Sequence, residues 1–418
     1  MAICKNNNKI KVNVSSEIGR LNAVLLHRPG VEIERMTPLN ANEALYSDIL
    51  NKRIVDDEYR YFCGVFEKVT KVFYVSDILE ELLEDDDLCS SLVTQSCAAE
   101  GCSYLVDELL QHSPKTIAKE LIEGFPYRNG IDPQRYAERR YVLRPLYNLF
   151  FTRDASSSVY DRVLINSMSF DVRKRENLIY KAIFKHYFGC EVINAQEWNR
   201  NAHTEGGDVQ IGRPDLLCIG EGIRTDAKGI EFLAHTFKDR PKFNIIVQQL
   251  PHHPDSFIHL DMVYTFLDRD RCMMYEPMLR KTNEFAGKAT TLIEVEGGKI
   301  KHRECKNMLE ALKKVGIEME PVFCGGDDIW MQQREQWHSG ANFFALAPGK
   351  VIGYRRNSHT IDALDKAGFS VLNAEDIVDG RVCIDDYNRC VVTFAASELP
   401  RAGGGARCMT MPINRDNI

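Results

Sequence analysis

The stretch "GGDVQIGRPDLLCIGEG" (206–222), followed by "AKGIEFLAHTF" (227–237), carries the pattern that decides the fold. Its first part reads as a strand, a turn at Arg213-Pro214 and a second strand, because β-favouring residues flank a turn signal. Its second part places apolar residues at helical spacing. The stretch therefore predicts a unit of two strands followed by a helix.

The same order of elements recurs along the chain. Hairpins are predicted at 157–168, 259–276 and 342–357, helices at 175–188 and 359–369, and a first strand at 21–26. These segments give about five units of the ββα kind, and the class is α/β. A recurring unit that cannot bury its own apolar face favours a radial or stacked array.

Residues 76–140 follow a different pattern, with helical spacing and no strand pattern. "SDILEELLEDDDL" (76–88) predicts a helix capped by Ser76 that ends in a solvated acidic run. In "SPKTIAKELIEGF" (113–125), Ser113 stands at a cap, Pro114 at the first helical position and Gly124 at the end. We therefore expect an all-helical insertion at 76–140, within a catalytic α/β part formed by 1–75 and 141–418.

Composition narrows the class of function. The chain has 418 residues, a net charge of −7, 44% hydrophobic and 27% charged residues, which is typical of a globular protein that does not bind nucleic acid. No apolar run reaches the ~20 residues that cross a membrane, and the polar N-terminus lacks the apolar core of a signal peptide. The 13 cysteines show no paired spacing, so we expect a cytoplasmic protein with neither disulfides nor a structural zinc site.

Reactive side chains gather at predicted strand ends in different units and in one glycine loop. Strand ends in a radial array converge on one mouth, so we expect these side chains to share a cavity. They are Asp154 in "NLFFTRDAS", Glu205 and Asp208 in "HTEGGDV", His259 and Asp261 in "HLDMVYTFLD", and Cys408 in "GGGARCM".

Cys408 is the candidate nucleophile among these residues. A loop with three glycines can present a side chain that a packed core cannot, and Arg407 with a nearby histidine could lower the pKa of the thiol. "HLD" places His259 and Asp261 on one face of a predicted strand. The alternatives are a packing cysteine, an ordinary surface or core histidine and, for Glu205, a β-bulge acid without a role.

Several buried acids beside one thiol indicate the charge of the substrate. Buried carboxylates are costly unless a cation lies among them. A planar guanidinium is the cation that suits these carboxylates and the thiol best, because it donates paired hydrogen bonds to carboxylates and offers an electrophilic carbon to a thiolate. The residues therefore predict a substrate shaped like the side chain of arginine.

Six blocks carry a resemblance to a known family. From about Val14 to Pro412 the chain resembles arginine deiminase, of the guanidino-group-modifying superfamily. The blocks are "SEIGRLNAVLLHRPG" (16–30), "NLFFTRD" (148–154), "EGGDVQIG" (205–212), "HLDMVYTFLDRD" (259–270), "REQWHSGANFFALAPGKVIGYRRN" (334–357) and "RCMTMPI" (407–413).

The resemblance implies a fold and an activity. The fold is a propeller of five ββαβ modules with a helical insertion. The activity is hydrolysis of L-arginine to L-citrulline and ammonia through a covalent amidino-cysteine intermediate, without metal or organic cofactor. The family also implies a homodimer or a higher homo-oligomer.

The resemblance further implies roles for single residues. Cys408 matches the nucleophile, His259 the general acid/base, Glu205 its partner, and Asp154 and Asp261 the carboxylates that hold the guanidinium. The residues that match substrate-binding positions are Arg173 and Arg224 for the substrate carboxylate, Asn148, Phe151, Asp208 and Gly403.

The chain departs from the bacterial pattern of the family at two places. Ala155 follows the motif aspartate where many members have proline, and Gly403 stands where they have a second loop arginine. Whether Arg401 reaches inward in its place is left open, and so is one contact to the substrate carboxylate.

Three other readings stay open at this point. One is a related enzyme that acts on agmatine, methylated arginine or protein-bound arginine. Another is a propeller that only binds, and the third is a metal hydrolase with "HLD" and "EGGD" as ligands.

Overall fold

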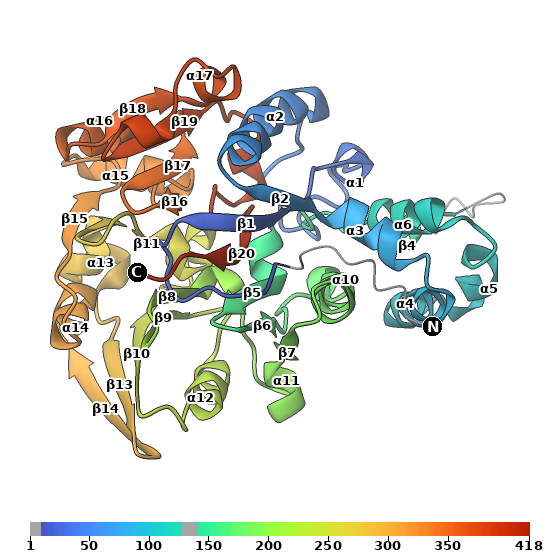
Figure 1. Ribbon diagram of the computed structural model, residues 1–418, viewed down its shortest axis with the longest axis horizontal. Helices are drawn as coiled ribbons and strands as arrows, with labels where there is room; N and C mark the ends of the chain where they lie inside the picture. Colours follow the sequence, from blue (N-terminus) through green and yellow to red (C-terminus); the bar gives the residue numbers. More distant parts are fainter. Residues whose placement is uncertain (1–9, 128–140) are drawn as a thin grey trace.

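The computed structural model describes residues 10–127 and 141–418, and it shows a mixed α/β protein (Figure 1). Five of the six sheets in these ranges share one local order: an antiparallel pair of strands, with a further strand parallel to one of the pair. At least one helix lies between the parallel strands in the chain. The recurring unit predicted from the sequence is thus present.

The unit at 206–249 is formed by residues that the sequence pattern marked. Strand β8 (Val209–Arg213) pairs antiparallel with β9 (Leu216–Glu221), and β10 (Lys242–Gln249) pairs parallel with β9. Between them, α12 (Ala227–Thr236) begins after Asp226, whose side chain accepts a hydrogen bond from the Gly229 amide at 2.8 Å. A carboxylate at this position satisfies an amide that the first helical turn leaves free.

A hairpin that was not predicted extends this sheet to five strands. Strand β13 (Thr290–Glu296) pairs antiparallel with β10 and with β14 (Lys299–Cys305). Gly297 and Gly298, both at positive φ, form its turn. Figure 1 shows the hairpin projecting at the edge of the molecule.

The first and last strands of the chain lie side by side. Strand β1 (Leu21–Leu26), as predicted, pairs parallel with β2 (Lys71–Tyr74) and antiparallel with β20 (Met411–Arg415) (Figure 1). The intervening helices are α1 (Val31–Glu34) and α2 (Lys52–Val69).

The next unit starts directly after the Asp154 block. Strand β5 (Ser156–Val159) pairs with β6 (Arg162–Ile165), which pairs parallel with β7 (Glu191–Ile193). The helices of this part are α8 (Thr152–Ala155), α9 (Asp171–Lys174), α10 (Glu176–Ala182), its π-helical continuation η2 (Ile183–Tyr187) and α11 (Ala195–Trp198).

The hairpin predicted at 259–276 is shorter than expected. Strand β11 (Tyr264–Phe266) pairs with β12 (Arg271–Met274), which pairs parallel with β15 (Glu320–Phe323). Leu260–Met262 form a 3-10 turn, η5, so the prediction that His259 and Asp261 share one face of a strand is wrong. The helices of this part are α13 (Glu276–Arg280) and α14 (Met308–Lys314).

The last unit has four strands in the order β16-β17-β19-β18, with β19 parallel to both of its neighbours. The strands are β16 (Phe344–Ala347), β17 (Lys350–Tyr354), β18 (Ser370–Asn373) and β19 (Cys390–Phe394). The helices are α15 (Ile329–Trp337), α16 (Ser358–Lys366) and α17 (Ala374–Val378).

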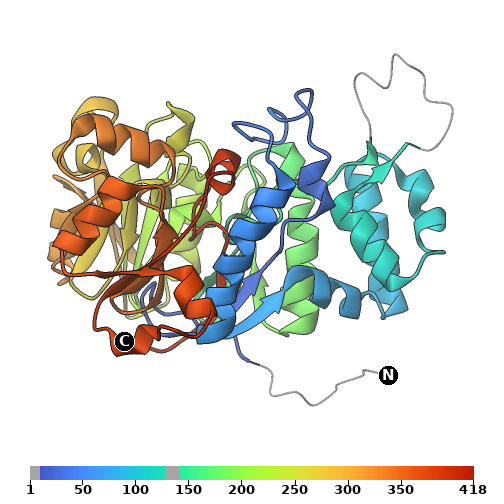
Figure 2. The same cartoon turned by 90° about the horizontal axis from the view of Figure 1, so that it is seen from above.

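The segment after β2 is mainly helical, and its helices lie together at one side of the molecule (Figures 1 and 2). Ser113 caps its last helix as predicted, with Gly124 at the C-cap at φ +82°. The helices are α3 (Val75–Leu82), α4 (Asp86–Ala99), η1 (Ser103–Leu105), α5 (Val106–Leu109) and α6 (Pro114–Glu123).

Three details of this segment differ from the prediction. Helix α3 begins at Val75, not after a cap at Ser76, and it ends at Leu82. The acidic run is exposed, as predicted, but it does not end α3: Asp85 accepts a hydrogen bond from the Leu88 amide and caps the next helix, α4. The segment also contains strand β3 (Phe125–Pro126), paired with β4 (Tyr141–Leu143), so it is not all-helical; residues 128–140 of the predicted insertion lie outside the described residues.

The helical segment packs on the α/β part through a shared apolar core. Leu79, Val93 and Leu121 from its helices join Ile179 and Phe184 from α10 and η2 in one buried cluster. The twelve cysteines among the described residues are all free, and none of the helices described is both long and apolar enough to cross a membrane.

Candidate active site

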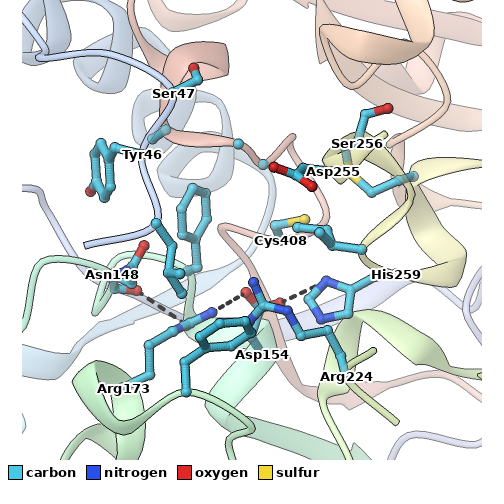
Figure 3. A pocket seen from close by; sticks show the side chains of 18 of the residues that line it. Tyr46, Ser47, Asn148, Asp154, Arg173, Arg224, Asp255, Ser256, His259 and Cys408 are labelled. Carbon is cyan, nitrogen blue, oxygen red and sulfur yellow. Dashed lines mark hydrogen bonds and ion pairs between the residues drawn. The ribbon is translucent and has the colours of Figure 1, made fainter. Parts of the chain in front are cut away.

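A cavity of about 310 Å³ collects most of the predicted site residues (Figure 3). Glu205, Asp261 and Asp208 lie behind its wall, fully buried. Of the eleven predicted residues, eight line the cavity: Asn148, Phe151, Asp154, Arg173, Arg224, His259, Gly403 and Cys408.

Cys408 lies between the glycine loop and strand β20, with its sulfur at the cavity wall. The Asp261 carboxylate oxygens lie 3.7 and 3.9 Å from Sγ. The glycines before it permit a close approach, because a Cβ at Gly404 would come within 2.4 Å of the Phe151 ring. The loop thus places the sulfur against neighbouring side chains, which explains why small residues precede the cysteine.

The prediction that Arg407 and a nearby histidine lower the pKa of the Cys408 thiol is wrong for this state. Burial, followed by the negative charges of Asp261 and Asp154, raises the pKa of Cys408 well above its ordinary value. Arg407 opposes this only weakly, since its guanidinium is bound to Glu17 and Asp261. Cys408 is therefore a neutral thiol at neutral pH.

His259 is held between two carboxylates. Its Nε2 lies 2.9 Å from Glu205 Oε2, and its Nδ1 lies 3.9 Å from Asp154 Oδ1. Burial disfavours the charged ring, but Asp154, Glu205 and Asp208 outweigh it and raise the pKa of His259 to about 9. The imidazolium form therefore dominates at neutral pH, with Nδ1 free of hydrogen-bond partners among the described residues.

Glu205 stays ionised although it is fully buried. Burial alone raises the pKa of Glu205, but Arg224 and the hydrogen bond with His259 outweigh it and hold the pKa well below its usual range. Arg224 Nη1 lies 3.1 Å from Glu205 Oε2. The carboxylate thus binds two cations at once and orients the imidazole.

The two arginines predicted to bind a substrate carboxylate are ion-paired with acids of the site. Arg173 donates from Nη1 to Asp154 Oδ2 at 2.8 Å (Figure 3). It also donates from Nη2 to Glu176 at 2.9 Å, and Arg224 pairs with Glu205. The second oxygen of Asp154, Oδ1, has no hydrogen-bond partner in the described structure and lies 3.9 Å from His259 Nδ1. Without substrate, the guanidinium groups of the chain thus neutralise the acids of the cavity.

Asp261 is anchored from behind by a buried ion-pair network. Arg407 Nη1 lies 2.9 Å from Asp261 Oδ2, and the same guanidinium lies 3.0 Å from both Glu17 oxygens. Although burial opposes ionisation of Glu17, Arg407 and Arg153 lower the pKa of Glu17 to about 2. Burial raises the pKa of Asp261 above its ordinary value, against the effect of Arg407.

Asp208 supports the turn that carries His259. Its Oδ1 accepts a hydrogen bond from the Leu260 amide at 2.9 Å, whereas Oδ2 has no partner in the described structure. Burial raises the pKa of Asp208 to about 7, with His259 acting in the opposite direction. The hydrogen bond to Leu260 helps to fix η5 and gives one reason why this segment is not a strand.

Several neighbours of the site were not predicted. Asn342 donates from Nδ2 to Cys408 Sγ at 3.2 Å, and Glu17 holds Arg407. Both residues stand inside sequence blocks that resemble the family, but no local pattern distinguishes them. The cavity is also lined by Tyr46, Ser47, Asp255 and Ser256 (Figure 3).

The structure shows where Arg401 lies relative to the loop around Gly403. Gly403 lines the cavity with φ +91°, a conformation that favours glycine. Arg401 does not line it, because its guanidinium pairs with Asp48 at 3.0 Å on the surface. Nothing in the described residues therefore supplies a cation at the Gly403 position.

Metal ligation finds no support in the residues that the structure describes. They contain no group of three or more His, Cys, Asp and Glu side chains placed to hold a metal ion. The acids and His259 contact guanidinium groups and each other instead.

Comparison with known proteins shows which family this chain matches. The family model "Arginine deiminase" matches residues 42–415. An arginine deiminase of Limosilactobacillus fermentum is 32% identical over 428 residues, covering 97% of this chain and 99% of the relative. One from Mycoplasma capricolum is 33% identical over 423 residues, covering 98% of both chains.

Among solved structures, an amidinotransferase of the saxitoxin biosynthetic pathway from Microseira wollei is similar. Its TM-score is 0.55 at 14% identity, with 97% of this chain and 98% of that chain covered. The fold is therefore the α/β fold of amidinotransferases, with a cavity that presents a cysteine, a histidine and carboxylates. Within that class, the chain belongs to the arginine deiminase family.

Proposed function

We propose that the protein is a hydrolase of linear amidines that converts L-arginine and water to L-citrulline and ammonia. The observation that carries the proposal is one cavity with a thiol, an imidazolium and the free oxygen of a carboxylate. A guanidinium needs acceptors on its plane and a nucleophile beside its carbon, and this cavity supplies both.

Substrate binding requires an exchange of partners. The substrate guanidinium would lie between Asp154 and Asp261, where Arg173 now occupies Asp154 Oδ2. Released from Asp154, Arg173 would face the substrate carboxylate together with Arg224, both at the cavity wall. Asn148, Phe151 and Gly403 line the same cavity and would contact the substrate chain; Asp208 acts only from behind, through η5.

The bound guanidinium would also activate the nucleophile. Burial and, after it, the charges of Asp261 and Asp154 raise the pKa of the Cys408 thiol, so a cation on these carboxylates offsets the part that their charges contribute. The free enzyme then holds an unreactive thiol. On substrate binding the thiol releases its proton to solvent water while His259 stays protonated, so the thiolate forms where an electrophile is already in place.

The reaction would proceed in two displacements. The Cys408 thiolate attacks the guanidinium carbon, and His259 donates its Nδ1 proton to the departing amino group, which leaves as ammonia. An amidino-thioether on Cys408 remains. The neutral His259 then accepts a proton from water as the water attacks the same carbon, and the thiolate leaves as citrulline forms. Dividing one difficult substitution in this way is the usual gain of covalent catalysis.

The deciding experiment measures citrulline formed from L-arginine by the wild type, Cys408→Ala and Cys408→Ser. Both variants should keep the fold and form no citrulline, whereas Cys383→Ala, at an exposed cysteine, should behave as the wild type. Acid quench followed by mass spectrometry should find the amidino adduct on Cys408. Citrulline formation by Cys408→Ala would contradict the assignment.

Related substrates and other classes are separated by simple variations of this assay. Arg173 and Arg224 favour a free α-carboxylate, so L-arginine should be turned over far better than agmatine. Loss of activity with a chelator would favour a metal hydrolase. Absence of ammonia release with every guanidino compound would favour a protein that only binds.

We further propose that the five similar sheets form a propeller of five ββαβ modules. Residues 1–75 and 141–418 would form the catalytic unit, and 76–140 an insertion in it. Two observations support this arrangement: the shared strand order of the five sheets, and the pairing of β1 with β20, which would close a ring. By likeness to the family we propose a cytoplasmic homodimer or higher homo-oligomer, which light scattering after gel filtration would test.

A further inference from the structure

Asn342 contacts both the backbone and the sulfur of the cysteine loop. It lies just before β16, and its side chain is buried. Its Oδ1 accepts hydrogen bonds from the amides of Arg407 at 2.8 Å and Cys408 at 3.3 Å. Its Nδ2 lies 3.2 Å from Cys408 Sγ and 3.2 Å from the Asp261 carbonyl oxygen.

The orientation of this side-chain amide is fixed by its partners. Two backbone N–H groups donate to one terminal atom, which must be the oxygen, so the nitrogen must face the sulfur. The loop is pressed against the amide, since a Cβ at Gly405 would lie 2.6 Å from Asn342 Cβ. The N–H donor is therefore already in place before any substrate arrives.

Besides Asn342, the backbone amide of Gly405 donates to the sulfur, and this hydrogen bond lowers the pKa of Cys408 against the effect of burial. Asp261 and Asp154 disfavour a negative charge on it, and the guanidinium of Arg407 is directed to carboxylates. The ionisable groups close to the sulfur are Asp261, Asp154, Arg407 and Tyr354, whose hydroxyl donates to the Gly404 carbonyl. The other ionisable groups that line the cavity are His259, Arg173, Arg224, Asp255 and Tyr46.

We propose that Asn342 is a catalytic residue whose Nδ2–H group donates a hydrogen bond to the Cys408 thiolate. This bond stabilises the sulfur anion twice, when it forms for attack and when it departs from the amidino intermediate. The inference rests on the proposed function of Cys408 as the nucleophile. A donor that needs no reorganisation at the moment of reaction is the most effective kind.

A purely structural role for Asn342 makes a different prediction. Anchoring the loop requires only the acceptor Oδ1, which Asn342→Asp retains for the amides of Arg407 and Cys408. The same variant replaces the donor at the sulfur by a second oxygen and adds a negative charge there, whereas Asn342→Ala adds none, so a loss shared by both variants reports the missing donor. Asn342→Ala removes both functions, and Asn357→Asp makes the same change at a buried asparagine that donates to the His338 carbonyl instead.

The test measures alkylation of Cys408 by iodoacetamide between pH 6 and 10, read by peptide mass spectrometry, with circular dichroism as the check of folding. Because a hydrogen bond to a charged group is worth about one pKa unit or more, Asn342→Asp should slow alkylation about tenfold at pH 8, which lies below the raised pKa of the Cys408 thiol. Asn342→Ala should show a similar loss, and Asn357→Asp the wild-type profile.

An Asn342→Asp variant with the wild-type alkylation profile would overturn the inference; if that variant does not fold, the profile of Asn342→Ala decides in the same way. The readout does not depend on turnover of arginine. If the wild type forms no citrulline, the proposed function is wrong. If the wild type forms citrulline normally and the Asn342 variant keeps the wild-type alkylation profile, only the proposed role of Asn342 is wrong.

Discussion

Replacing Glu205 by Gln should move the upper limit of the pH range of activity downward. The pKa of His259 is about 9, compared with an ordinary 6.5, and this difference corresponds to roughly 3 kcal/mol in favour of the imidazolium. Asp154, Asp208 and Glu205 share this effect, and Glu205 is the acid that binds the ring directly at 2.9 Å. Losing its charge should therefore lower the pKa of His259 by about one to two units.

The consequence for the reaction follows from the role of the imidazolium as proton donor. Activity requires the charged ring, so it declines as the pH rises through the pKa of His259: near 9 in the wild type and near about 7 to 8 in Glu205→Gln. At pH 8.5 the kcat of Glu205→Gln should be about tenfold lower than that of the wild type, in addition to any difference between the two at pH 6.5. The assay is citrulline formation from saturating L-arginine between pH 5.5 and 10.

Glu335→Gln provides the control for this experiment. Glu335 is also buried, but it accepts hydrogen bonds from Thr360 and not from His259, so its variant should keep the wild-type upper limit. An unchanged upper limit in Glu205→Gln would refute the argument that Glu205 keeps His259 protonated.

The raised pKa of His259 also links stability to pH. Protonation of the ring stabilises the folded chain fully below about pH 6.5, and this contribution is lost as the pH rises through about 9. Urea unfolding of the wild type should show this loss on the alkaline side, and Glu205→Gln should reduce it.

Two further changes test the framework of the site. Arg407→Met leaves Glu17 and Asp261 buried without their cation, so the free energy of unfolding in urea should fall by about 3–5 kcal/mol; a loss below about 1 kcal/mol would show that the network carries little stability. Ser113→Ala removes the hydrogen bond to the Thr116 amide and should cost about 1 kcal/mol in the same measurement, without an effect on kcat. A change in kcat would contradict the view that this helix only supports the fold.

Local patterns predicted the elements of the fold well. The strands β8 and β9 follow from apolar residues around a turn signal, and the start of α6 follows from Ser113 and Pro114. The hairpin of β13 and β14 was missed although Gly297-Gly298 stands between two strand-like runs, which is a recognisable turn signal.

Predictions failed where distant residues decide the local structure. Residues 259–263 were expected to be a strand, but Asp208 binds the Leu260 amide and a 3-10 turn forms instead. The thiol pKa was expected to fall because Arg407 is adjacent in sequence, yet that guanidinium binds Glu17, 390 positions away.

The candidate site was predicted as a set of residues but not as a set of contacts. The resemblance to the family placed Arg173 and Arg224 at a substrate carboxylate, whereas both arginines bind carboxylates of the chain in this structure. Asn342 was missed because its partner Cys408 lies 66 positions away and no spacing rule connects them.

The pairing of β1 with β20 has a consequence for synthesis. A ribosome releases the acids and the imidazole early, while the sulfur leaves the exit tunnel together with β20, the strand that pairs with β1. A nascent chain that stalls before that point lacks Cys408, which follows every other residue of the candidate site. On the proposed mechanism such an unfinished copy forms no citrulline.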